Sequence, residues 1–195
     1  MDQNIKRMHN FALKVGIRLN TCHTILRNDK VNTIDDPNLK YVFESLARRV
    51  HYIICDYRPP NEYVFQPIMD VVQKIGQDFL RIRSMLQELN EDIEVIAQTG
   101  WPSWGFNENL SPNNVSNEVE YWNYMNDWAN ENNFPLVMYE AFDTPWKNDL
   151  KRANDFSAAG PTGSAGHHGW FRRFDNNSDM FTYIPKVRGL WIFCN

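Results

Sequence analysis

The sequence predicts an α/β protein built on a parallel sheet. Segments with helical spacing of apolar residues alternate with short strand-like apolar runs, four times along the chain. Each strand-like run is followed by a polar loop that contains Pro, Trp or several charged residues. Parallel strands need crossover connections, which helices usually supply. We therefore expect four helix–strand units whose strand ends share one rim, where α/β proteins carry their functional sites.

The first unit is a helix within residues 5–15 followed by a strand over residues 17–22. Gly16 ends the helical pattern between them. The second unit begins at Pro37, because Pro is favoured at the first position of a helix. Its strand is VHYIICDY, residues 50–57. The expected buried face of the second helix consists of Leu39, Val42, Phe43 and Leu46.

The third unit is a long helix that starts near Pro67 and leads into a strand over residues 93–98. The fourth unit is a helix capped by Ser116, followed by the strand FPLVMYEAF, residues 134–142. Apolar stripes at helical spacing define both helices. They are Ile68, Val71, Val72, Ile75, Phe79, Ile82, Leu86 and Leu89 in one, and Val119, Trp122, Met125 and Ala129 in the other.

Composition narrows the class of protein. The chain has 195 residues, of which 43% are hydrophobic and 23% charged, so we expect one globular domain with a substantial core. A net charge of -4 provides no basic face for nucleic acid or for an anionic membrane surface. No apolar run approaches the roughly 18 residues of a membrane span, and the first ten residues are polar. As given, the chain is expected in the cytoplasm, or outside the cell or in the cell wall if an N-terminal part is missing.

Two segments carry a resemblance to a known family. QTGWPSWG, residues 98–105, resembles the E-T-G-W-P-S signature of glycoside hydrolase family 17, and YEAFDTPWK, residues 139–147, resembles that family's F-E-A-F-D-E-P-W-K segment. Weaker matches are HYIICDYRPPNEY at residues 51–63, the helix and strand of residues 119–142, and GHHGWFRRFD at residues 166–175.

The resemblance implies a (β/α)8 barrel of retaining enzymes that cleave or rearrange β-1,3-glucans with two Glu residues. One Glu acts as acid/base, and the other attacks the anomeric carbon. The position of the nucleophile is Gln98 here, and an amide is a very poor nucleophile. The family's acid/base Glu precedes the region that residues 5–15 resemble. We therefore expect residues 1–195 to form one domain holding only the last four βα units, a partial barrel that lacks its N-terminal half, with an irregular tail at residues 187–195.

By resemblance, the substrate-binding residues are Trp101, Glu140, Asp143, Trp146 and Lys147, and Arg58 occupies a position where the family has Tyr or His. Each has a structural alternative. A Trp after Gly at a strand end often serves packing alone. Glu140 could anchor Lys147 or a loop amide, and Asp143 and Lys147 could instead pair with each other.

No metal site is expected. His167 and His168 are adjacent, but a third ligand at a suitable spacing is missing. The three Cys residues are far apart, which gives neither a disulfide framework nor a zinc motif. The sequence contains no phosphate-binding loop, and retaining glycosidases use no cofactor, so none is expected.

Two functions remain open. The chain is either a truncated and catalytically impaired β-1,3-glucan hydrolase or transglycosylase, or a non-catalytic glucan-binding or scaffolding pseudoenzyme. An unrelated α/β protein would require both signature segments to arise by chance. In either case the expected ligand is a β-glucan or another glycan. Four parallel strands alone leave an inner face uncovered. We expect it to be covered by a second copy of the chain, by the stretches FTYIP (residues 181–185) and GLWIFC (residues 189–194) folding back, or by a missing N-terminal half.

Overall fold

The structure is a computed structural model of the whole chain. It describes residues 14–20, 22, 36–59, 66–105, 113–149, 162–175 and 181–187. The expected first helix falls outside the described residues as far as position 13. Positions 188–195 of the expected tail also fall outside them. The chain divides into two compact units. Unit 1 comprises residues 1–58, 73–99 and 126–137, and unit 2 comprises residues 59–72, 100–125 and 138–195.

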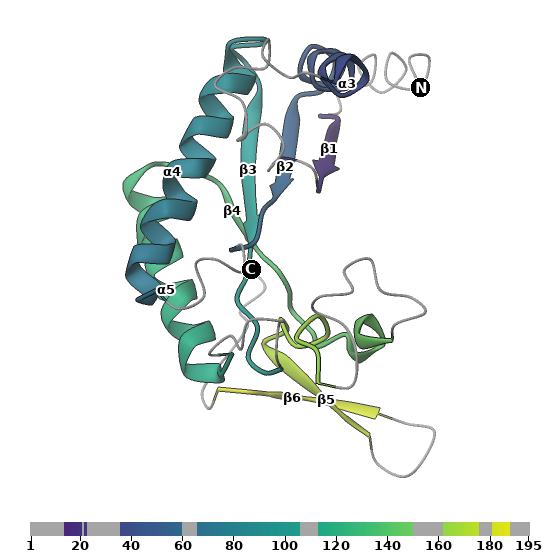
Figure 1. Cartoon of the computed structure of the whole chain (residues 1–195), viewed down its shortest axis with the longest axis vertical. Helices are drawn as coiled ribbons and strands as arrows, with labels where there is room; N and C mark the ends of the chain where they lie inside the picture. Colours follow the sequence, from purple (N-terminus) through teal and green to yellow (C-terminus); the bar gives the residue numbers. More distant parts are fainter. Residues whose placement is uncertain are drawn as a thin grey trace. The chain divides into compact units, whose positions relative to one another are not determined.

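A four-stranded parallel sheet confirms the predicted α/β class (Figure 1). The strands are β1 (Gly16–Leu19), β2 (Tyr52–Asp56), β3 (Glu94–Thr99) and β4 (Leu136–Met138), hydrogen-bonded in the order β1-β2-β3-β4. Every predicted strand exists, but β4 is much shorter than residues 134–142. Phe134, at the start of the predicted strand, is instead buried in an aromatic cluster beside the sheet.

The two faces of the sheet differ in burial. Cα partners across β1, β2 and β3 are Arg18, Ile54 and Ile96 on one face. Ile54 and Ile96 are half-buried and Arg18 is exposed. Val137 of β4 is 40% exposed. The intervening residues point to the opposite face and are fully or almost fully buried: Ile53, Cys55, Val95 and Ala97. One face of the sheet is thus packed, whereas the other is only partly covered, as expected for a barrel wall. The dimer and the missing half stay predictions.

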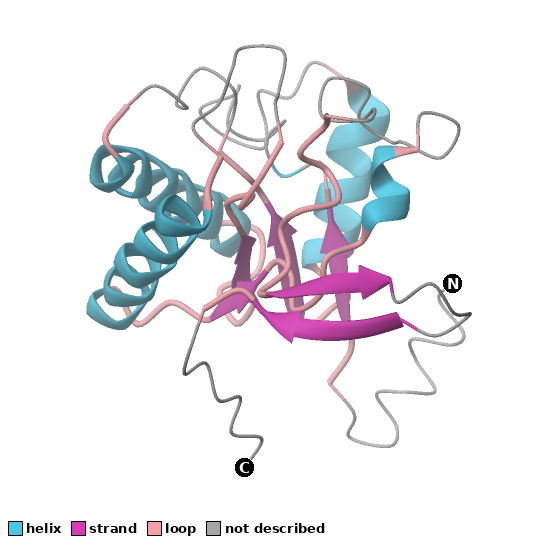
Figure 2. Cartoon of the chain, turned by 90° about the horizontal axis from the view of Figure 1, so that it is seen from below, coloured by secondary structure: helices cyan, strands magenta, loops and turns pink. Residues whose placement is uncertain are grey.

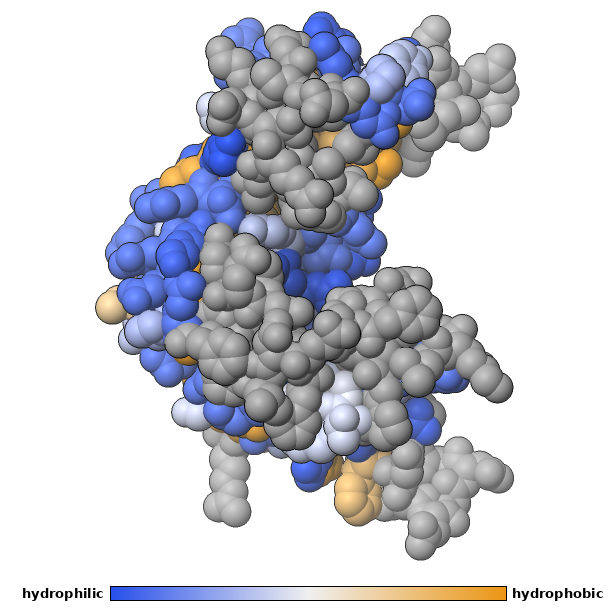
Figure 3. Space-filling view, in the orientation of Figure 1, coloured by the Kyte–Doolittle hydropathy of each residue, from blue (hydrophilic) through white to orange (hydrophobic). Residues whose placement is uncertain are grey.

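The helices bury most of the stripe residues that their spacing predicts, but Val42, Leu89, Val119 and Trp122 are not buried. Helix α4 (Ile68–Gln87) buries seven of its eight predicted stripe residues, and its solvent side is largely hydrophilic (Figure 3). Helix α3 (Pro37–Ala47) begins at Pro37 as expected. Val42, however, is 43% exposed, so its predicted burial is wrong. Among the described side chains of α3, the buried positions are Phe43, Leu46 and Ala47, a run of i, i+3 and i+4, and the side chain of the predicted Leu39 lies outside the described part.

Helix α5 (Val115–Glu131) starts one residue before the predicted cap. The backbone N–H of Asn117 donates to the side-chain Oδ1 of Asn114 at 2.8 Å, so Asn114 is the N-cap and the assignment of Ser116 is wrong. The predicted stripe of α5 is only partly right, because Val119 and Trp122 are half-buried. The buried positions of α5 are Glu118, Tyr121, Met125 and Ala129.

Aromatic side chains form the core of unit 1 between α4 and the end of α5. The Phe79 ring lies 6.2 Å from Trp128 and 5.9 Å from Phe134, measured between ring centroids. Trp128 and Phe134 are 5.3 Å apart. Phe79 is fully buried. Burying one such ring contributes roughly 1.5–3 kcal/mol of transfer free energy, so this cluster is a major anchor of α4.

Unit 2 contains an antiparallel pair of strands that the sequence analysis does not predict. Strands β5 (Phe171–Asp175) and β6 (Phe181–Pro185) lie side by side, with Phe171 opposite Pro185 and Asp175 opposite Phe181 (Figure 2). The short 3-10 helix η3 (Pro145–Asn148) belongs to the same unit. Within the described part of the chain, none of the helices has the length and apolar character required to cross a membrane.

Candidate functional site

Gln98 lies in unit 1 at the carboxyl end of β3, beside an acid that the sequence analysis did not single out. Its Cα partner across the sheet is Asp56, the last residue of β2. Neighbouring strands are about 4.8 Å apart, and Cα partners point to the same face. The backbone N–H of Tyr57 also donates to the Gln98 carbonyl at 3.0 Å, which fixes the two strand ends together. Asp56 could have been found from the sequence, because it ends the strand next to the one that carries Gln98.

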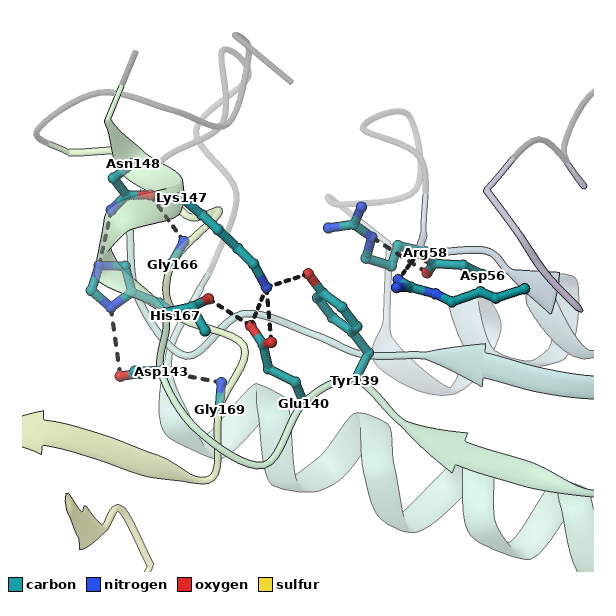
Figure 4. Close-up of polar contacts among 12 residues, drawn as sticks. Asp56, Arg58, Tyr139, Glu140, Asp143, Lys147, Asn148, Gly166, His167 and Gly169 are labelled. Carbon is teal, nitrogen blue, oxygen red and sulfur yellow. Dashed lines mark hydrogen bonds and ion pairs between the residues drawn. The ribbon is translucent and has the colours of Figure 1, made fainter. Parts of the chain in front are cut away.

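Two arginines hold the Asp56 carboxylate (Figure 4). Arg18 of β1 donates from Nη2 to Oδ2 at 2.5 Å, and Nε of Arg58 lies 3.9 Å from Oδ1. The Asp56 side chain is only 4% exposed, whereas the two arginine side chains are 45% and 41% exposed. We call Arg18, Asp56, Arg58 and Gln98 the strand-end group. One oxygen of its carboxylate, Oδ2, is hydrogen-bonded to Arg18, whereas Oδ1 accepts no hydrogen bond from the described residues, and Gln98 itself is neutral.

Gln98 retains one unused hydrogen-bonding atom. Its side chain is half-buried, and Oε1 is buried without a hydrogen-bond partner among the described residues. A buried acceptor without a partner costs about 1–3 kcal/mol. Within the described part of the chain this oxygen accepts no hydrogen bond, and the amide carries no negative charge for attack on carbon.

In unit 2, backbone hydrogen bonds join two of the segments that carry the family resemblance. The N–H of Glu140 donates to the His168 carbonyl at 3.1 Å, and that of Asp143 donates to the Phe171 carbonyl at 2.8 Å. A Cβ on Gly169 would lie only 2.0 Å from the backbone nitrogen of Asp143. The close approach of residues 140–144 to residues 166–171 thus requires Gly at position 169.

Glu140 and Lys147 form an ion pair with further hydrogen bonds (Figure 4). Nζ of Lys147 donates to Oε1 and Oε2 of Glu140 at 2.7 and 2.8 Å, and to the Tyr139 hydroxyl at 2.6 Å. The Thr144 hydroxyl donates to Glu140 Oε1 at 2.7 Å. The Lys147 and Glu140 side chains are 32% and 20% exposed, so both are accessible to a ligand. Glu140 therefore anchors Lys147, which is one of the two structural alternatives that the sequence analysis gives for Glu140.

Asp143 pairs with a different cation from the one proposed. Nζ of Lys186 lies 2.8 Å from Asp143 Oδ1, and both side chains are about 5% exposed or less. The Gly169 N–H also donates to Oδ1 at 3.0 Å, and Lys186 donates to the Ser103 hydroxyl at 2.5 Å. The expected pairing of Asp143 with Lys147 is therefore wrong. Lys186 follows strand β6, and nothing in its sequence context marks it as a buried cation.

The two predicted tryptophans have different environments. Trp101 is 3% exposed, and its ring packs 5.5 Å from that of Tyr121. The preceding residue, Gly100, allows this close packing. A Cβ at position 100 would lie 1.9 Å from the Tyr139 carbonyl oxygen, an approach that only Gly permits. Trp146, in η3, is 46% exposed. Trp146 therefore offers a ring face to solvent, whereas Trp101 contributes to packing.

A small cavity lies in unit 2. Its volume is about 10 Å³, and it is lined by Gly100, Trp101, Glu118, Tyr121, Trp122, Met138, Tyr139, His168 and Trp170. Glu118 is 3% exposed, and neither carboxyl oxygen has a hydrogen-bond partner among the described residues. Burial raises the pKa of Glu118 to about 8, an effect that Lys186 partly offsets and Asp143 increases. Glu118 was not predicted, because a Glu on an apolar stripe reads as a surface residue.

A metal-binding group is not found in the described ranges, where no three His, Cys, Asp or Glu side chains come together in a suitable arrangement. His167 instead lies with Nδ1 3.8 Å from Asp143 Oδ2, and His168 is buried with its ring 5.5 Å from that of Tyr139. These contacts give both imidazoles structural roles in unit 2.

Comparisons with known proteins support the fold. No family model matches the sequence, and no curated protein matches it with significance. Among solved structures, the chain is similar to the glycoside hydrolase family 17 β-1,3-glucanosyltransferase of Rhizomucor miehei, with a TM-score of 0.58 and 18% identity. An active-site mutant of the R. miehei enzyme in complex with laminaritriose gives a TM-score of 0.59, also at 18% identity. Both matches cover 87% of this chain and 50% of the other, so the chain spans about half the length of these neighbours. The fold of this chain is thus similar to about half of the barrel of these neighbours.

Proposed function

We propose that this chain is a glycoside hydrolase family 17-like protein that binds β-1,3-glucan and cleaves it at or near the background rate. The fold, the two signature segments and a structural neighbour that holds laminaritriose support the ligand class. One observation carries the proposal against catalysis. The position of the family's nucleophile is an amide, Gln98, and the acid beside it is ion-paired with Arg18.

The charges of the other candidate acids favour the same proposal. Retaining cleavage needs one carboxylate that attacks the sugar and a second carboxyl group about 5–5.5 Å away that donates a proton. Asp56 is held by Arg18, Glu140 by Lys147, and Asp143 by Lys186. A carboxylate engaged in short charge-assisted hydrogen bonds is a weak nucleophile. Loss of the nucleophile in a different hydrolase lowers turnover on the order of 10⁶-fold.

Binding and cleavage can be separated in one set of measurements. Isothermal titration calorimetry with laminarihexaose should show binding by the unaltered chain. Chromatography of the same mixtures should show no oligosaccharide products beyond the buffer control. Absence of binding would refute the proposal. Release of products at enzyme-like rates would instead show that Gln98 is wrongly assigned as a disabled nucleophile.

Restoring the charge gives a sharper test of Gln98. The Gln98→Glu variant should hydrolyse a 2,4-dinitrophenyl β-laminaribioside at least about 10²-fold faster than the unaltered chain, because this leaving group needs no proton from an acid. The Gln98→Asn variant keeps an amide and should gain nothing. Mass spectrometry of the Gln98→Glu variant should detect a glycosyl ester on the protein. Equal rates for the two variants would contradict the assignment of position 98.

A further inference from the structure

Trp104 is an exposed aromatic residue that the family signature does not include. It is the second Trp of QTGWPSWG and follows the matched E-T-G-W-P-S positions. It is 48% exposed, close to the 46% of Trp146, whereas Trp101 of the same segment is 3% exposed. Single exposed aromatic residues are common on protein surfaces and need no function. The question is whether the surroundings of Trp104 are organised for a ligand.

A ring contact and the hydrogen bonds of the adjacent residues position Trp104. Its ring lies 4.8 Å from the His167 ring in an edge-to-face arrangement. The His167 carbonyl accepts hydrogen bonds from both the N–H and the hydroxyl of Ser103, at 2.8 and 2.9 Å. After Trp104, Gly105 has a φ of 93°, and its carbonyl accepts a hydrogen bond from Asn113 at 3.0 Å. The residues on both sides of Trp104 are therefore fixed by hydrogen bonds, and its indole contacts the His167 ring.

His167 also contacts the 3-10 helix η3, which carries Trp146. Nδ2 of Asn148 lies 3.3 Å from Nε2 of His167, and Asn148 is the last residue of η3. The residue before Asn148 in η3 is Lys147, which forms the ion pair with Glu140. His167 thus touches Trp104 on one side and η3 on another. Hydrogen bonds among Ser103, His167 and Asn148 thus form one frame within unit 2. This frame carries two exposed indoles and a partly exposed ion pair.

We propose that Trp104 and Trp146 form an aromatic subsite in which a glucosyl ring of a β-1,3-gluco-oligosaccharide stacks next to the Glu140–Lys147 pair. This inference rests on the proposed function and extends it to the residues that hold the sugar. The C–H faces of a β-glucosyl ring are flat and apolar, which suits an indole. Its equatorial hydroxyls can exchange hydrogen bonds with the carboxylate and the ammonium group.

The test compares single substitutions of exposed aromatic residues of unit 2 in the full chain. Laminarihexaose is titrated by calorimetry into the unaltered protein and into the Trp104→Ala, Trp104→Phe and Phe142→Ala variants. Phe142 is the matched control, because it is 47% exposed and packs on Tyr183 at 4.6 Å, outside the frame. Trp104→Ala should weaken binding at least about tenfold, Trp104→Phe should retain most of it, and Phe142→Ala should change it less than twofold.

The outcomes separate this inference from the proposed function. If the unaltered chain binds and Trp104→Ala binds equally well, the subsite is wrong while the proposed function stands. If the unaltered chain does not bind, the proposed function fails and the subsite fails with it. Indole N–H resonances provide a second readout, since the Trp104 signal should shift on addition of laminarihexaose. A shift confined to the buried Trp101 would also overturn the subsite.

Discussion

At the scale of single residues, two carboxylates of the candidate site are held by cations that are distant in the sequence, whereas Glu140 pairs with Lys147 only seven positions away. Asp56 pairs with Arg18, and Asp143 pairs with Lys186. The sequence indicated Asp143 through its motif, but the partner 43 positions away follows only from the fold. Partners distant in sequence leave no local pattern. The sequence could therefore indicate Asp143 and the local pairing of Glu140 with Lys147, whereas the pairings of Asp56 and Asp143 with distant cations could not be predicted.

The buried pair of Lys186 and Asp143 should be costly to break from one side. Replacing Lys186 with Met leaves the Asp143 carboxylate buried without its cation, which typically destabilises a protein by about 3–5 kcal/mol. Urea unfolding at pH 7 should show this loss for Lys186→Met. The double variant with Asp143→Asn should recover part of it, because no uncompensated charge then remains.

Lys14 provides the matched control for that prediction. It forms an ion pair with Glu94 at 3.9 Å, but the two side chains are 75% and 46% exposed. Exposed pairs contribute about 0–1 kcal/mol. Lys14→Met should therefore leave the free energy of unfolding nearly unchanged. Equal effects of the two Lys substitutions would show that the Lys186 pair is not buried as described.

At the scale of elements, spacing predicted the described helices and all four parallel strands, because each must bury an apolar face. It failed where polar residues serve the interior. Glu118 occupies the buried stripe of α5, a position that an apolar pattern cannot reveal. The strands β5 and β6 were also missed. Their residues are short mixed runs, whose pairing depends on backbone hydrogen bonds with each other.

The buried carboxyl of Glu118 should make stability fall as pH rises. Its pKa is about 8 in the folded chain, above the ordinary value of 4.5, so the folded state holds this proton more tightly than the unfolded state. The contribution is fully present below pH 4.5 and is lost progressively as pH rises to about 8. Between these pH values the free energy of unfolding should fall by up to about 1.4 kcal/mol per pH unit.

Chemical denaturation of Glu118→Gln across that pH range provides the measurement. Gln is neutral at every pH and nearly the same size, so this variant should lose the downward component of the slope. It should match the unaltered chain near pH 4.5 and exceed its stability at pH 8. Glu120, on the same helix, is exposed and has the matched substitution Glu120→Gln, which should leave the slope intact. Parallel curves for the unaltered chain and Glu118→Gln would refute a buried titration at position 118.

At the scale of the whole molecule, the chain divides into two compact units, yet two helices contribute residues to both. Helix α4 supplies residues 68–72 to unit 2 and residues 73–87 to unit 1, and α5 is divided at position 126. A helix is a continuous hydrogen-bonded ladder that is costly to interrupt. The division was not predictable from the apolar pattern, which runs through both helices without a break. We therefore expect the units to unfold together.

Substitution of one core residue tests this coupling. Phe79 is fully buried in unit 1, so Phe79→Ala should lower the free energy of unfolding by about 3–5 kcal/mol. If the helices couple the units, the most protected amides of β5 and β6 in unit 2 should lose the same amount of protection in native-state hydrogen exchange. Gln73→Ala, on the exposed side of α4, should leave both units unchanged. Protection of β5 and β6 that persists while unit 1 is destabilised would mean that the units unfold independently, and that the strand-end group could open without disturbing the Glu140–Lys147 pair.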